Sequence, residues 1–152
     1  GGWTTRVDYQ ISELKPEMTL LVLIGGNAWQ RDDLRLTTLI QQCLHRKVIV
    51  GAICGAVDYL ARNGLLTGYR HTGNAQFLWQ SFSRYQNPTD FEPQQVVVDR
   101  QLVTANGTAV LAFTSAVLKA SGQLTTAAKQ ALDLQQLGYY EYMRQYGDPF
   151  KP

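Results

Sequence analysis

The sequence has few of the residues that mark disulfide-stabilised or metal-binding proteins. Its 152 residues contain two cysteines, Cys43 and Cys54, and two histidines. Two cysteines are too few for a disulfide scaffold, and neither has the spacing of a metal-ligand motif. We therefore expect no metal and no other cofactor, and a reducing, cytoplasmic setting.

Charge and long apolar runs are also scarce. A net charge of +2 is too small to predict binding to nucleic acid or to a membrane surface. No apolar run approaches the roughly 20 residues of a membrane span, and no secretory signal is recognisable. The length suits one domain with a real core, so residues 1–152 are taken as a single domain.

What the sequence does contain is an alternation of apolar runs and helical periodicity. Continuous apolar or β-branched runs predict strands at 19–24, 48–53, 96–99 and 102–105, the last two as a hairpin. Apolar residues at helical spacing predict helices at 36–44, 55–63, 75–82, 110–118 and 124–134. This alternation predicts an α/β architecture with a mostly parallel sheet and helices on both faces.

Other segments carry weaker patterns. Residues 7–11 are predicted to form a short edge strand or an extended arm, interrupted afterwards by Pro16. Residues 66–72 are predicted to be extended and 87–90 to form a loop. The aromatic tail at 139–143 could cover the sheet or meet another subunit, and we favour the first.

The most informative stretch surrounds Cys54. A β-branched run leads into this cysteine, and the small residues Gly55 and Ala56 then open a predicted helix. The order predicts a nucleophile elbow, in which the chain turns sharply and presents one side chain at a helix start. There, free N–H groups and the positive end of the helix dipole favour a thiolate. Cys54 is thus a candidate nucleophile, with a buried, inert cysteine as the alternative, whereas Cys43 is predicted to be core.

A nucleophilic cysteine needs a base and an oxyanion site. His71 follows the elbow helix on a segment that can return close to Cys54, so it is the candidate partner; a surface histidine is the alternative. His45 ends a helix and is assigned a structural role. The main-chain N–H groups of Gly26 and Gly55 are the candidate oxyanion donors, because carboxyl ends of parallel strands meet at one crevice.

Four segments, in this order, resemble the ThiJ/PfpI family of the class I glutamine amidotransferase-like superfamily. They cover residues 21–26, 50–56, 65–72 and 97–109. The resemblance implies a flavodoxin-like three-layer sandwich with Cys54 as the reactive centre, His71 nearby, and the Gly26 and Gly55 amides as oxyanion donors. Family members are described as intracellular proteases or amidases, deglycases, glyoxalases, redox-responsive chaperones and stress proteins. Many form dimers or larger assemblies, which implies a homo-oligomer.

The sequence departs from the family pattern in two ways. Gly55 stands where protease-type members place a histidine directly after the cysteine, which leaves His71 as the plausible imidazole. The family's acidic partner comes from an N-terminal segment, and none of the glutamates considered is a convincing substitute: Glu13, Glu17, Glu92 and Glu141. We therefore expect the N-terminal strand-helix-strand portion to be supplied by another polypeptide piece or to lie outside this sequence.

Three functions follow as hypotheses. The leading one is a cysteine-dependent hydrolase, of protease, amidase or deglycase type, acting on a small-molecule or peptide substrate. In it Cys54 attacks a carbonyl carbon and His71 shuttles the proton. The alternative is a redox- or stress-sensing, chaperone-like protein in which Cys54 is oxidised without true turnover. The third is a binding or scaffold protein that keeps the fold without catalysis.

Overall fold

The computed structural model describes residues 4–14 and 17–151. Pro16, which was named among the sequence predictions, lies outside these residues. Four strands form one sheet in the order β1-β2-β4-β3. Their bounds are Leu20–Leu23 (β1), Ile49–Ile53 (β2), Val96–Asp99 (β3) and Leu102–Ala105 (β4).

The sheet is mostly parallel, as predicted. Strands β1, β2 and β4 run parallel, and β3 pairs antiparallel with β4 as the other arm of the hairpin. The turn between these arms contains Arg100 at a φ of 53°. Strands β2 and β4 are buried along nearly their whole length, which explains why their sequences are continuous apolar runs rather than alternating patterns.

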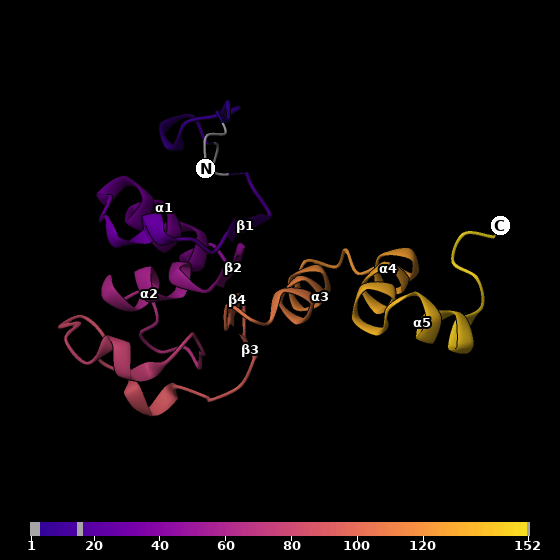
Figure 1. Cartoon of the computed structure of the whole chain (residues 1–152). Coiled ribbons are helices and arrows are strands. Elements are labelled where there is room, and N and C mark those ends of the chain that lie inside the picture. Colours follow the sequence, from indigo (N-terminus) through magenta and orange to yellow (C-terminus); the bar gives the residue numbers. More distant parts are fainter. Residues whose placement is uncertain (1–3, 15–16, 152) are drawn as a thin grey trace.

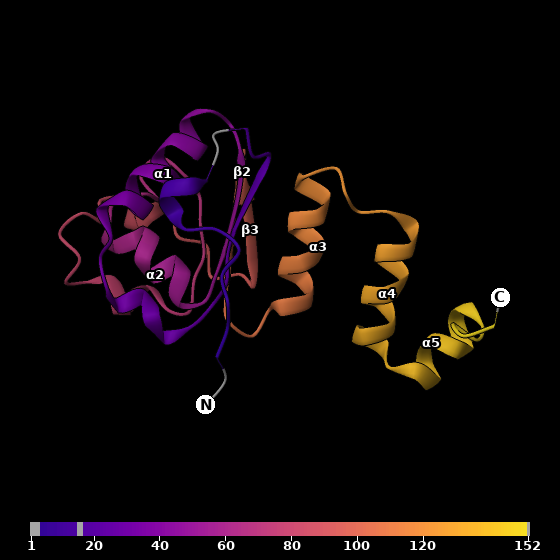
Figure 2. The same cartoon turned by 90° about the horizontal axis from the view of Figure 1, so that it is seen from above.

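Helices cover both faces of the sheet and complete the predicted three-layer α/β sandwich (Figures 1 and 2). Helices α1 (Leu34–His45) and α2 (Gly55–Arg62) pack on one face, and α3 (Val110–Ala120) packs on the other. Helix α1 begins where the Asp33 carboxylate accepts hydrogen bonds from the N–H groups of Arg35 and Leu36.

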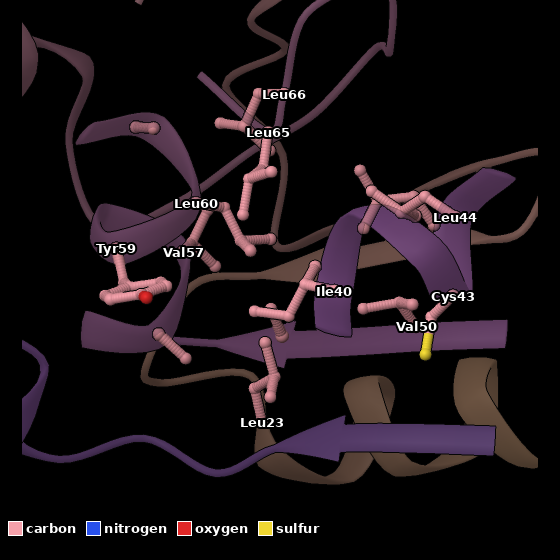
Figure 3. Close-up of a cluster of buried hydrophobic side chains, with 14 of the residues drawn as sticks. Leu23, Ile40, Cys43, Leu44, Val50, Val57, Tyr59, Leu60, Leu65 and Leu66 are labelled. Carbon is pink, nitrogen blue, oxygen red and sulfur yellow. The ribbon is translucent and has the colours of Figure 1, made fainter. Parts of the chain in front are cut away.

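The core on the α1–α2 side contains Cys43, as predicted (Figure 3). Its side chain is buried with Ile40, Val50 and Leu60, and burial raises the pKa of its thiol. On the opposite face, a smaller cluster centres on Phe113 of α3. The sheet is therefore held between two apolar layers.

The C-terminal helices differ from the prediction. Helix α4 (Thr126–Leu137) packs on α3, and α5 (Tyr139–Tyr146) packs on α4, so the aromatic tail does not cover the sheet (Figure 2). Gly138, at a φ of 75°, separates the two helices and lets the chain change direction. Helix α4 begins later than predicted because the Thr125 side chain caps it.

Three other predicted segments are less regular than expected. Residues 7–11 form no strand, and a single 3₁₀ turn spans Ile11–Glu13. Residues 66–72 are mostly turns with one isolated bridge to Phe91, and the predicted helix at 75–82 is reduced to a 3₁₀ turn at Gln76–Trp79. In the predicted loop a 3₁₀ turn occupies Pro88–Asp90. Among the described residues, no helix has the length and apolarity needed to cross a membrane.

Candidate functional site

The site is built around the sharp turn that joins β2 to α2. Cys54 stands between the last residue of β2 and the first residue of α2, with a φ of 60° and a ψ of −132°. Side chains rarely occupy this region of backbone space, and such strain clusters at functional positions. The Cys54 N–H donates to the Ala105 carbonyl over 3.1 Å, which ties the turn to the end of β4. The predicted elbow geometry is present.

Close packing around Cys54 explains two of the glycines that surround it. A Cβ on Gly55 would lie 2.5 Å from the carbonyl oxygen of Gly26. A Cβ on Gly107, in the turn between β4 and α3, would lie 2.9 Å from the Cys54 sulfur. Glycine is required at both positions if the loops are to close around the thiol.

Three of the four predicted site residues come together. Gly26, Cys54 and Gly55 line one cavity of about 140 Å³ at the carboxyl end of the sheet. Gly55 is the first residue of α2, so its N–H has no partner within the helix and can point at a ligand. The same cavity is lined by Asn74 and Asp58.

His71, the fourth predicted residue, is not brought to the thiol. Its side chain is fully buried, with Nδ1 2.7 Å from the Tyr69 carbonyl oxygen and Nε2 2.8 Å from the Tyr85 hydroxyl. The ring packs among Trp79, Tyr85 and Phe91. Burial lowers its pKa because the charged form loses its solvation. The imidazole therefore has two partners other than Cys54.

The side chain that does reach the sulfur belongs to Asn74. Its Nδ2 lies 3.4 Å from the Cys54 Sγ, and its Oδ1 accepts a 2.9 Å hydrogen bond from the Gly107 N–H. Asn74 was not among the site residues predicted from the sequence. No local pattern could have found it, because its contacts join segments 20 and 33 residues away.

Asp58 is a second site residue that was not predicted from the sequence. It follows Cys54 by four residues, which is about one helical turn, so this spacing could have identified it. One carboxylate oxygen accepts from Trp79 Nε1 over 2.7 Å, which fixes the group at the cavity wall.

Three of the glutamates considered from the sequence have partners elsewhere. Glu92 pairs with Arg70, Glu141 contacts Arg144, and Glu13 accepts from the Gln10 N–H. In the described part of the chain, no three His, Cys, Asp or Glu side chains are grouped closely enough to hold a metal ion.

Cys54 also borders a second, apolar cavity of about 550 Å³ on the α3 side of the sheet. Its walls come from β1 and α3 and include Val22, Ile24, Phe113 and Val117. The thiol thus stands between a small polar cavity and a larger apolar one. A carbonyl compound held at the sulfur has space on both sides.

Comparison with known proteins identifies relatives along the chain. Residues 1–120 match the model of the DJ-1/PfpI family. The chain is 38% identical over 151 residues to the uncharacterized protease YdeA of Bacillus subtilis, an alignment that covers 99% of this chain and 77% of YdeA. It is also 33% identical over 122 residues to the uncharacterized protease YoaZ of the same organism, covering 78% of this chain and 58% of YoaZ.

Solved structures agree with this assignment. The thiJ/pfpI family protein from Bacillus anthracis superposes with a TM-score of 0.83 and 33% identity, covering 93% of this chain and 68% of that protein. The DJ-1 superfamily protein Atu0886 from Agrobacterium tumefaciens superposes with a TM-score of 0.75 and 29% identity, covering 82% of this chain and 68% of that protein. From its sequence match and its fold together, the chain belongs to the DJ-1/PfpI family.

Proposed function

We propose that this protein is a cysteine-dependent hydrolase of amide bonds, with Cys54 as its nucleophile. The observation that carries the proposal is the strained backbone of Cys54 at the start of α2, beside the main chain of Gly26 and inside a polar cavity. The names of YdeA and YoaZ as uncharacterized proteases support a reaction of this class.

The proposed reaction begins at the sulfur. The Cys54 thiolate attacks the carbonyl carbon, and negative charge develops on the carbonyl oxygen. The N–H groups of Gly26 and Gly55 are the proposed donors to that oxygen. The carbon–nitrogen bond then breaks, the amine leaves with a proton, and a thioester remains on Cys54. Water hydrolyses the thioester, releasing a carboxylate and restoring the thiolate.

The proton for the leaving amine needs a carrier within the cavity. His71 is held by Tyr69 and Tyr85. Asp58 lines the cavity itself, fixed by its hydrogen bond from Trp79. We therefore assign proton transfer to Asp58, acting directly or through one water molecule. Its carboxyl group gives a proton to the leaving amine, and it regains one of the two protons released when water hydrolyses the thioester; the other proton leaves to solvent.

The test measures release of a fluorescent amine from a panel of peptide amides. Cys54→Ser is expected to abolish turnover. Asp58→Asn preserves shape and can still accept from Trp79, yet it cannot carry a proton, so it is expected to lower turnover by a factor of about 10²–10⁴. Full activity in the Cys54→Ser variant would refute the nucleophile. Unchanged activity in Asp58→Asn would refute only the role of Asp58.

A second candidate function is supported by the position of His71. With its imidazole engaged elsewhere and Cys54 partly exposed, the site also suits a redox sensor. The thiolate would attack peroxide, taking one oxygen to become a sulfenate while water leaves. Peroxide titration followed by intact mass distinguishes the two: stoichiometric oxygen addition at Cys54, with no amide turnover, favours the sensor.

A further inference from the structure

We propose that the carboxamide of Asn74 is a catalytic hydrogen-bond donor to the Cys54 sulfur and stabilises its thiolate. This inference deepens the proposed function, since it rests on Cys54 being the reactive group. Its basis is geometric. Asn74 Nδ2 lies 3.4 Å from the Cys54 sulfur, and Asn74 lines the same small cavity as Cys54.

The orientation of the carboxamide follows from its other partner. A backbone N–H can only donate, so the atom of Asn74 that faces the Gly107 N–H at 2.9 Å must be the oxygen. The amide nitrogen is then turned toward Cys54. An amide nitrogen carries two protons and accepts none, so the sulfur has to be the acceptor in this contact.

The backbone of Asn74 is held independently of its side chain. Asn106 Nδ2 donates to the carbonyl oxygens of Gly73 and Asn74, over 3.2 and 3.3 Å. The Asn106 oxygen in turn accepts from the Thr108 N–H over 2.9 Å, which fixes that amide by the same reasoning. The donor is thus pre-positioned from the turn between β4 and α3, and little reorganisation is needed when charge forms on the sulfur.

The contact favours the ionised form of Cys54. A thiolate is a much better acceptor than a thiol, so a fixed donor stabilises it selectively. Asn74 is exposed, and water therefore weakens the effect without reversing its sign. A carboxylate in the same place would retain the bond from Gly107 but would turn an oxygen toward the sulfur. Like charges would then disfavour the thiolate.

The experiment compares alkylation of Cys54 by iodoacetamide in the wild-type protein and in three variants at pH 7. Iodoacetamide is neutral, so a new carboxylate does not repel the reagent itself. Asn74→Asp is expected to slow alkylation about tenfold or more, and Asn74→Ala to give an intermediate rate. Cys54→Ala, which leaves Cys43, supplies the background. A thermal scan of each variant confirms folding.

The order of the rates decides the proposal. A purely structural role predicts a wild-type rate for Asn74→Asp, which has the same shape and keeps the Gly107 contact; that result would overturn the donor role. So would alkylation of Asn74→Ala more slowly than Asn74→Asp. At pH 10, where an ordinary thiol is ionised, the rates should converge; a persistent gap would indicate restricted access instead and would also refute the proposal. Alkylation of Cys54 does not require turnover of a substrate. The alkylation assay therefore tests the donor role of Asn74 separately from the proposed hydrolase activity, which the amide-release assay tests.

Discussion

Because the backbone at Cys54 is strained, we expect the Cys54→Gly variant to be at least as stable as the Cys54→Ala variant. At most sites, replacing alanine by glycine destabilises a protein, because glycine loses more backbone freedom on folding. Cys54 is different because its φ of 60° and ψ of −132° lie where a Cβ is unfavourable. The comparison of Cys54→Gly with Cys54→Ala removes the sulfur from both and isolates the effect of the Cβ.

The expected difference combines three contributions. Release of the backbone strain favours glycine by about 1–3 kcal/mol. The extra backbone entropy of glycine opposes this by about 0.5–1 kcal/mol. Loss of one partly buried carbon opposes it by about 0.4 kcal/mol, half the value for a fully buried methylene. Taking the middle of each range, Cys54→Gly should be more stable than Cys54→Ala by about 1 kcal/mol.

Urea unfolding followed by circular dichroism measures this difference. Ala131→Gly is the matched control, since Ala131 is exposed within α4 and has ordinary helical geometry. The control should lose about 1 kcal/mol. In a chain of this length, 1 kcal/mol corresponds to about 2–4 °C in Tm. If Cys54→Gly is less stable than Cys54→Ala by as much as the control loses, the turn is not strained and the reasoning fails.

Two further predictions concern His71 and Gly107. Burial lowers the pKa of His71 in the folded state, so the folded protein holds the imidazole neutral. Below about pH 6.5 the unfolded chain therefore binds a proton that the folded protein does not. As the pH is lowered through this range, the free energy of unfolding should fall by up to about 1.4 kcal/mol per pH unit. His71→Gln should flatten this slope between pH 7 and pH 5, whereas the exposed His45→Gln should not; equal slopes in wild type and His71→Gln would contradict it. Gly107→Ala places a Cβ 2.9 Å from the Cys54 sulfur, so alkylation by iodoacetamide should slow at every pH. An unchanged rate would contradict this prediction, because it would show that the turn moves away from the sulfur at little cost.

Much of the architecture was predictable because its causes are local. The run at 48–53 is continuous and β-branched because β2 is covered on both faces, and helical spacing from Leu36 to Leu44 reflects one apolar stripe on the core. The elbow was predictable for the same reason. A strand, a cysteine and two small residues in immediate succession specify a turn without reference to distant parts of the chain.

The tail and the segment at 75–82 were not predictable in this way. Tyr142 is buried against α4 rather than against the sheet, and nothing within the tail distinguishes one apolar partner from another. Trp79 is buried because Asp58 accepts its indole N–H and because His71 packs beside it. Those contacts come from elsewhere in the chain, and they leave room for one 3₁₀ turn in place of a helix.

The sequence by itself therefore determined the layered fold and which of the two cysteines has a partly exposed sulfur, since strand burial and a tight turn each leave a signature in neighbouring residues. Only the tertiary structure decided which side chain meets that sulfur. The Tyr85 hydroxyl forms a hydrogen bond with the imidazole of His71. The Gly107 N–H donates to the Asn74 oxygen, which leaves the Asn74 amide nitrogen facing Cys54. Hydrogen bonds depend on the distance between two groups and on the direction in which the donor points, and the spacing of residues along the chain predicts neither.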